Sequence, residues 1–131
     1  MIINYYGGDY FKIQAGDLAI LIDPENQRSF KGATLALNTI RPSLAETPLE
    51  ASPAWIDHQG EYEVNGIRVE GRTLGEEEKK EKTAYRIEFD EVRIGVLGHL
   101  AKDPDPKMQE FLMDCDVLII PAGEKPFISS A

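Results

Sequence analysis

Cysteine is nearly absent from this sequence, which contains Cys115 as its single thiol. One cysteine excludes an intramolecular disulfide framework and is typical of a protein from a reducing compartment. A chain of 131 residues forms one domain and buries roughly two thirds of the surface that its unfolded form exposes. We therefore expect residues 1–131 to fold as a single cytoplasmic domain without disulfides or a structural metal.

Basic residues and long apolar runs are also scarce. The 14 Lys and Arg residues are outnumbered by 23 Asp and Glu residues, and the resulting net charge of −9 disfavours nucleic acid as a partner because it would repel a phosphate backbone. No apolar run approaches the roughly 20 residues of a membrane-spanning helix, and the sequence does not begin like a signal peptide. We thus expect no membrane partner. The mixed-sign block at residues 76–82 is interpreted as a solvated turn.

A period of two dominates the pattern of apolar residues, which predicts strands. Three segments alternate around a short polar turn and are predicted to be hairpins: residues 9–22 around Gly16-Asp17, residues 61–70 around Asn65-Gly66, and residues 83–97 around Asp90-Glu91. The Asn-Gly pair is the strongest of these signals because both residues tolerate the positive φ of a two-residue turn.

The rest of the chain gives further strands and a single helix. Residues 34–39 and 55–57 are predicted strands, and Val117–Ile120 is apolar enough for a buried one. Residues 40–54 contain three prolines without clean periodicity, which predicts a loop. Proline in a first turn near 103–106 favours a helix whose apolar positions follow at helical spacing: Met108, Phe111, Leu112 and Cys115.

Five segments, in this order, resemble the metallo-β-lactamase superfamily, and within it the Zn-dependent hydrolase-like proteins related to ascorbate-phosphate lactonases. They are Ile3–Ile13, Leu18–Pro24, Gly60–Ile67 with its Gly-Glu-Tyr-Glu word, Ile94–Leu100 and Cys115–Gly123. The resemblance implies an α/β sandwich that is mostly sheet, with reduced helices and an incomplete C-terminal half. An unrelated β-sandwich with similar turns is the alternative.

The zinc ligands that the resemblance leads one to expect are largely missing. The family's His-x-His-x-Asp-His loop corresponds to residues 38–43, which read Asn-Thr-Ile-Arg-Pro-Ser, and a third ligand position falls within residues 72–76, which contain no His. The elements that deliver a final His would follow Gly123, near the end of the sequence. Zinc sites take three or four protein ligands that activate a bound water. We therefore assign no metal, cofactor-binding or catalytic residue.

The two histidines do not restore such a site. His99 occupies the position of the family's bridging Asp, so it is a relic ligand or, as the ligand count favours, a polar residue at a strand end. His58 matches no ligand and is interpreted as a surface residue. Cys115 lies between two acids that would raise its pKa and is interpreted as a core residue.

Three functions remain open. The leading hypothesis is a non-catalytic binding or structural module that keeps the fold without the metals. The second is a metal-dependent hydrolase whose ligands come from a missing segment or a partner chain, and the third is a truncated chain without activity of its own. Because the chain supplies many strands but few helices, we also expect a homodimer, with Val117–Ile120 close to the contact.

Overall fold

Strands make up nearly all of the secondary structure, as the two-residue period predicts. The structure is a computed structural model, and it describes residues 1–7, 10–24, 32–41, 54–77, 80–97 and 106–120. These residues form eleven strands and one helix: β1 Ile2–Gly7, β2 Tyr10–Ala15, β3 Leu18–Ile22, β4 Leu35–Leu37, β5 Ile40–Arg41, β6 Ala54–Ile56, β7 Gly60–Val64, β8 Ile67–Glu77, β9 Lys80–Phe89, β10 Val92–Val96, α1 Pro106–Leu112 and β11 Val117–Ile119.

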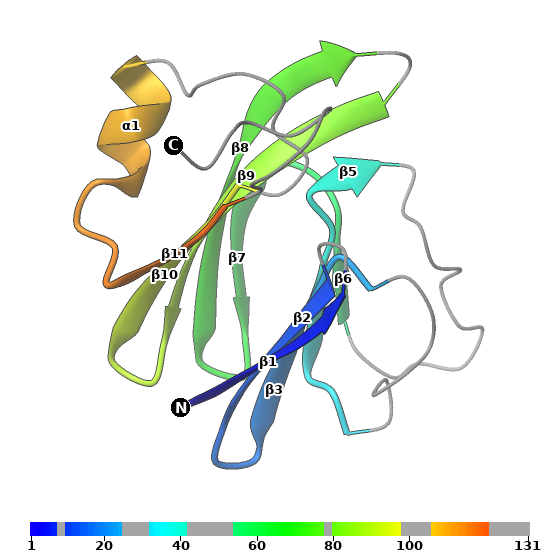
Figure 1. Cartoon of the computed structure of the whole chain (residues 1–131), viewed down its shortest axis with the longest axis vertical. Coiled ribbons are helices and arrows are strands. Elements are labelled where there is room, and N and C mark those ends of the chain that lie inside the picture. The colour runs from blue at the N-terminus through cyan, green and yellow to red at the C-terminus, as the bar shows by residue number, and fades with distance from the viewer. Residues whose placement is uncertain (8–9, 25–31, 42–53, 78–79, 98–105, 121–131) are drawn as a thin grey trace.

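Two sheets face each other across one apolar core (Figure 1). The first sheet has the order β1-β2-β3-β4-β6, and the second has the order β11-β10-β9-β8-β7, with β5 paired to β9. Alternation places one face of each sheet inward, so that Ile13 and Ile20 of the first sheet pack in the same cluster as Ile87 and Ile94 of the second. The predicted two-sheet sandwich, mostly strand with one helix, is confirmed.

The three predicted hairpins are present. Strands β2 and β3, β7 and β8, and β9 and β10 each pair antiparallel. Asn65 and Gly66 have φ values of 48° and 83°, as the Asn-Gly turn requires. Asp90 and Glu91 also have positive φ values, 53° and 61°, although neither is glycine.

Two segments predicted to be irregular contain strands instead. Strand β8 continues to Glu77 and β9 begins at Lys80, so most of the block at 76–82 is strand and not turn. Glu77 pairs with Lys80, and this opposite-charge pair is compatible with a strand end. In the predicted loop at 40–54, Ile40 and Arg41 form β5 and pair with β9. Ile40 is buried there, which its apolar side chain favours over a solvent-exposed loop.

Helix α1 covers part of the outer face of the second sheet (Figure 1). Its buried residues are Met108, Phe111 and Leu112, as predicted, but Cys115 lies beyond the end of the helix. Gly95 on β10 makes room for this packing, because a Cβ there would lie 2.8 Å from Leu112 Cδ2. No helix among the described residues is long and apolar enough to cross a membrane.

Strand β11 differs most from its prediction. It pairs in parallel with β10 but stands at the end of the sheet order, so it is an edge strand among the described residues. Leu118 is 49% exposed and Ile120 is 45% exposed, so the prediction that Val117–Ile120 is buried on both faces is wrong. Its four aliphatic residues indicate an interior strand, but no described strand covers its outer side.

Candidate functional site

The parallel strands β3, β4 and β6 end side by side, and their ends carry polar residues. Asp23 follows β3, Asn38 and Thr39 follow β4, and Asp57 follows β6. Sites in sheets of parallel strands commonly form at such carboxyl ends, because several loops converge there. This edge includes residues 38–41, where the resemblance would place the first zinc ligands, and it is therefore the candidate site.

Asp23 holds Thr39 through both carboxylate oxygens. Its Oδ1 accepts a hydrogen bond from the Thr39 backbone N–H at 2.7 Å, and its Oδ2 accepts one from the Thr39 hydroxyl at 2.5 Å. The Asp23 N–H donates to the Leu37 carbonyl at 2.8 Å, and Asp23 adopts a positive φ of 47° in this position. Asp23 and Thr39 are both buried, which strengthens these charge-assisted hydrogen bonds.

Tyr85 reaches this edge from β9, in the opposite sheet. Its hydroxyl donates to the Asn38 carbonyl at 2.7 Å and to the Ile56 carbonyl at 3.3 Å. Burial raises the pKa of this hydroxyl far above its usual range, and the negative charges of Asp23 and Asp57 raise it further. Tyr85 is therefore a neutral donor that joins the two sheets at the candidate site.

Two more backbone hydrogen bonds complete this network. The Thr83 N–H donates to the Thr39 carbonyl at 2.9 Å, and the Asn38 N–H donates to the Ile56 carbonyl at 2.8 Å. The side-chain amide nitrogen of Asn38 is buried, and no described residue accepts its hydrogen bond. The carbonyls and carboxylate of this strand end are thus engaged by the protein itself.

A histidine and a second acid lie beyond β6. The Nδ1 atom of His58 is 2.8 Å from Asp57 Oδ1, and the His58 side chain is 53% exposed, which confirms that it is a surface residue. The Tyr62 hydroxyl donates to the carbonyls of His58 and Gln59. Gly60 allows this arrangement because its φ is 148° and a Cβ there would lie 2.8 Å from the Tyr62 hydroxyl.

The donors at this strand end do not fit zinc. Zinc in proteins is bound by Cys sulfur, His nitrogen or carboxylate oxygen. Asn38 and Thr39 offer an amide and a hydroxyl, Ile40 is apolar, and the Asp23 carboxylate is engaged by Thr39. Among the residues that the structure describes, no group of three or more His, Cys, Asp or Glu side chains could hold a metal.

The remaining positions considered in the sequence are not brought to this edge. Arg72, in the segment where a third ligand would fall, is in β8 with its side chain exposed and bonded to Glu70. His99 and residues 42–43 lie outside the described residues. Glu61 and Glu63 are exposed on β7, as predicted for one face of a hairpin.

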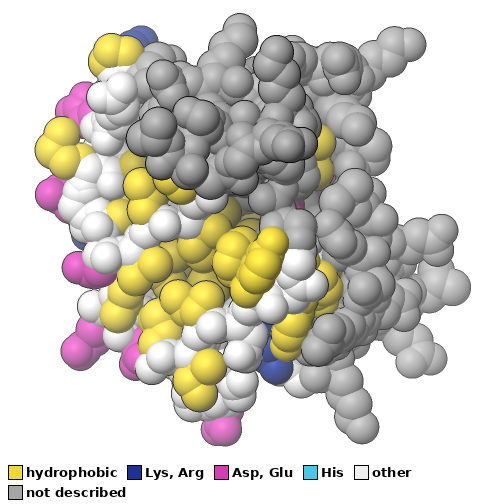
Figure 2. All heavy atoms as spheres, viewed as in Figure 1, with side chains coloured by type: hydrophobic (Ala, Val, Ile, Leu, Met, Phe, Trp, Pro, Cys, Tyr) yellow, Lys and Arg dark blue, Asp and Glu magenta, His cyan; other side chains and the backbone are white. Residues whose placement is uncertain are grey.

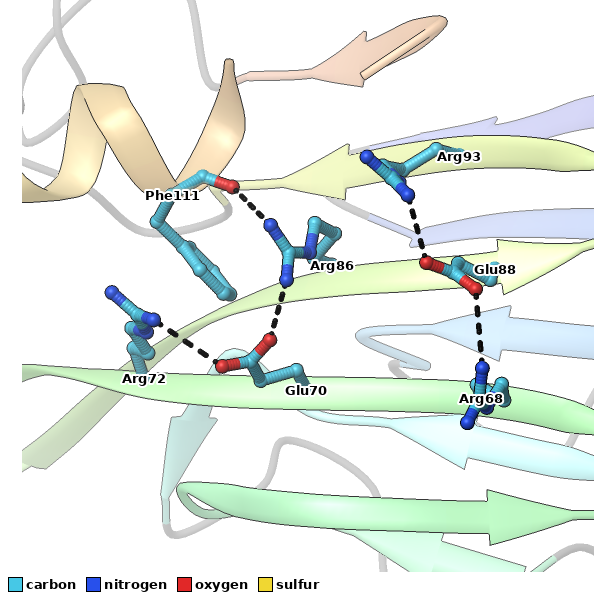
Figure 3. Close-up of polar contacts among 7 residues, drawn as sticks. All are labelled: Arg68, Glu70, Arg72, Arg86, Glu88, Arg93 and Phe111. Atoms are coloured by element: carbon cyan, nitrogen blue, oxygen red, sulfur yellow. Dashed lines mark hydrogen bonds and ion pairs between the residues drawn. The ribbon is translucent and has the colours of Figure 1, made fainter. Parts of the chain in front are cut away.

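The outer face of the second sheet carries a polar network (Figure 3). Glu70 bonds Arg86 at 2.7 Å and Arg72 at 3.3 Å, and Arg86 also donates to the Phe111 carbonyl at 3.2 Å near the end of α1. The guanidinium carbon of Arg72 lies 4.4 Å from the centre of the Phe111 ring. A cation at a helix C-terminus and above an aromatic ring is stabilising, so this network fastens α1 to the sheet.

A second group continues the network along the same face. Glu88 bonds Arg93 at 3.0 Å and Arg68 at 3.8 Å (Figure 3). A depression of about 390 Å³ lies beside these residues and is lined mainly by paired charges. Since each of these arginines already has a carboxylate partner, we interpret this face as a solvated charged surface and not as an anion site.

Cys115 is partly buried against the residues that α1 covers. Burial is the main cause that raises the pKa of its thiol. Asp116 and Asp114 also raise this pKa, whereas Arg86 and Arg93 lower it. The predicted direction is therefore right, but the flanking acids are a minor cause.

Sequence reasoning missed Tyr85 and the Glu70–Arg86 pair. The polar positions of β8 and β9 alternate with apolar ones, and this signal could have identified Glu70 and Arg86 as cross-strand partners. No local signal distinguishes Tyr85, because its function depends on the opposite sheet.

Comparison with known proteins identifies the family. The model of the β-lactamase superfamily domain matches residues 2–131, and the chain therefore belongs to this superfamily. A candidate Zn-dependent hydrolase of the metallo-β-lactamase superfamily from Thermotoga maritima has a similar structure, with a TM-score of 0.75 and 20% identity over 97% of this chain and 64% of its own. The metallo-β-lactamase fold protein YhfI from Bacillus subtilis gives a TM-score of 0.65 and 9% identity over 85% of this chain and 62% of its own.

These likenesses confirm the expected metallo-β-lactamase-like sandwich. The chain spans less than two thirds of either solved structure. No curated protein matches it.

Proposed function

We propose that this chain is a non-catalytic member of the superfamily, a binding or structural module that keeps the scaffold without a zinc centre. The Asp23–Thr39 clamp carries the proposal. Both carboxylate oxygens of Asp23 accept hydrogen bonds from Thr39, so the buried acid at the strand end stabilises the chain itself. A metal at this edge would have to replace charge-assisted bonds inside a buried network, which is costly.

The Gly60–Ile67 hairpin supports a finer placement near the ascorbate-phosphate lactonase-like proteins. Gly60 and Tyr62 form a fixed turn that closes over two backbone carbonyls. This arrangement gives the Gly-Glu-Tyr-Glu word a structural purpose that does not need a metal. The word is therefore compatible with a relative that has lost its catalytic centre.

A metal-dependent hydrolase is the second candidate. It is favoured by the Thermotoga maritima structure, which is described as a candidate Zn-dependent hydrolase and of which this chain covers 64%. In that case the ligands would come from outside the described residues or from a partner chain, and His99 would be one of them. The two proposals therefore differ in what His99 does.

Metal analysis of the purified chain tests the proposal. After dialysis against zinc and then against metal-free buffer, we expect well below 0.1 zinc ions per chain by elemental analysis, and an unchanged melting temperature in EDTA. The variants His99→Ala and His58→Ala form a matched pair, since these are the two histidines of the sequence. About one retained zinc per chain, lost in His99→Ala but not in His58→Ala, would overturn the proposal in favour of the hydrolase.

A further inference from the structure

Strand β11 is an edge strand with the composition of an interior strand. Four aliphatic residues follow one another from Val117 to Ile120, and such a run is typical of a strand that is covered on both faces. Edge strands usually carry a lysine, a proline or an inward charge that prevents pairing with another chain, and β11 carries none of these. Its free side is therefore suited to pair with another strand.

The backbone of β11 presents hydrogen-bonding groups on that free side. The Leu97 N–H donates to the Ile119 carbonyl at 2.9 Å, so the polar backbone groups of Ile119 face β10. Because these groups alternate in direction along a strand, the N–H and C=O of Leu118 face away from β10. No described strand lies on that side of the sheet.

We propose that a second copy of this chain pairs with β11, antiparallel and across a two-fold axis at Leu118. In this register the two Leu118 residues form a hydrogen-bonded pair and exchange two N–H···O=C bonds. The second sheet would then continue from one copy into the other. The inference does not depend on the proposed function, because a catalytic chain would present the same edge.

The apolar surface around β11 is large enough to contribute to such a contact. A standard interface buries about 800 Å² on each partner, or roughly a tenth of the 7825 Å² of this chain. Phe11, Val117 and Ile119 border the same core cluster. On β1, Ile3 and Tyr5 lie opposite Ile13 and Phe11 in the first sheet, and they remain 40% and 61% exposed.

Exposed hydrophobic side chains are therefore found on the end strands of both sheets. Figure 2 shows hydrophobic side chains gathered in the centre of the face on which Figure 1 places β1. A second copy seated on β11 could cover part of this surface as well as the strand edge.

Charge favours the antiparallel arrangement over a parallel one. Asp116 precedes β11, and the chain has a net charge of −9, so a pairing that brought the two Asp116 residues together would be repulsive. A two-fold axis at Leu118 separates them by about four residues, or roughly 13 Å along the strands. This distance exceeds the Debye length of about 8 Å at physiological salt.

Symmetry also favours contact between two β11 strands. A contact of β1 with β11 of the next copy would leave a free edge at each end and would give open assemblies. A β11 contact across a two-fold axis uses one edge of each copy and closes at two chains. The structure thus points to a dimer and not to a filament.

Disulfide trapping tests both the contact and its register. In a Cys115→Ser background, Leu118→Cys would place two thiols on residues whose Cα atoms lie about 5.5 Å apart, within the range of a disulfide. Ile120→Cys is the matched control, since Ile120 belongs to the same apolar run and is similarly exposed. The axis would separate the two Ile120 residues by roughly 13 Å, which is too far for a disulfide.

We expect mild oxidation to convert most of the Leu118→Cys chains, but few of the Ile120→Cys chains, into covalent dimers. Equal cross-linking of the two variants, or none in either, would overturn the proposed register. Light scattering of the unmodified chain should show a mass that rises with concentration from 14.6 kDa to a plateau at two chains. One chain throughout the micromolar range, or growth beyond two, would overturn the dimer.

Leu118→Lys gives an independent measure of the same contact. We expect it to raise the dimer dissociation constant at least tenfold, because it places a charge at the centre of the paired edge. Ile2→Lys on β1 is the control, since Ile2 is 61% exposed on the other end strand. Loss of association in Ile2→Lys but not in Leu118→Lys would show that β1 makes the contact instead.

Discussion

Tyr85→Phe removes a single oxygen atom from the strongest connection between the two sheets at the candidate site. The hydroxyl donates to the Asn38 carbonyl at 2.7 Å and to the Ile56 carbonyl at 3.3 Å. After the substitution the Ile56 carbonyl keeps the bond from the Asn38 N–H at 2.8 Å. The Asn38 carbonyl loses its bond from Tyr85 in a buried position, where water does not readily replace the donor.

The expected cost follows from this difference between the two carbonyls. A neutral hydrogen bond contributes about 0.5–1.5 kcal/mol net, and a buried group that loses its partner costs about 1–3 kcal/mol. We therefore expect Tyr85→Phe to lower the free energy of unfolding by about 2 kcal/mol. For a chain of this length the melting temperature should fall by roughly 5–10 °C. Because the pKa of Tyr85 is raised, its hydroxyl stays protonated, and this loss should be constant between about pH 6 and 9.

Tyr62→Phe is the matched control for this measurement. The Tyr62 hydroxyl also donates to two carbonyls, at 3.1 and 3.0 Å, but these bonds are exposed to solvent. Its loss should cost about 0.5 kcal/mol or less, since water replaces the donor. Urea unfolding followed by fluorescence, with calorimetry for the melting temperature, gives both values. Equal losses in the two variants would refute the argument that burial sets the cost at Tyr85.

Three other substitutions or reactions test separate parts of the structure. Gly95→Ala should destabilise the chain by about 1–3 kcal/mol in urea unfolding, because its Cβ would lie 2.7 Å from Leu118 Cδ1 and 2.8 Å from Leu112 Cδ2; a neutral result would mean that this layer is loosely packed. Glu91→Gly should stabilise it by about 0.5–1 kcal/mol, since glycine accepts the φ of 61° without strain, and a loss of stability would contradict that reading of the turn. The Cys115 thiol should react with iodoacetamide with a pH midpoint above that of an unstructured cysteine peptide, because burial raises its pKa, and a midpoint at or below the peptide's would show that the thiol is not buried.

The parts of the fold that the sequence predicts are those determined by neighbouring residues. The hairpin around Asn65-Gly66 follows from two residues that tolerate positive φ and from alternation on either side. The buried face of α1 follows from the spacing of Met108, Phe111 and Leu112. In each case a short segment contains both the turn or cap signal and the apolar pattern, so no knowledge of the remaining chain is needed.

The parts that sequence reasoning missed depend on distant partners. Ile40 becomes a strand residue because β9 lies beside it, and Tyr85 becomes a link between sheets because Asn38 lies opposite. Strand β11 was predicted to be buried from its composition alone, but whether a strand is internal depends on what occupies both of its sides. Composition reports what a strand tolerates, and position in the sheet is a property of the whole assembly.

This distinction also explains how the chain can resemble a hydrolase family so closely without its ligand residues. The Gly-Glu-Tyr-Glu word holds a turn, because Gly60 leaves space for the Tyr62 ring. Gly71 in the paired strand similarly leaves space for Tyr85, since a Cβ there would lie 2.9 Å from its ring. The segments that carry the resemblance therefore contain residues that build the sandwich. Residues 38–41, which would carry the chemistry, can differ without loss of the fold because Asp23 and Tyr85 hold that strand end in place.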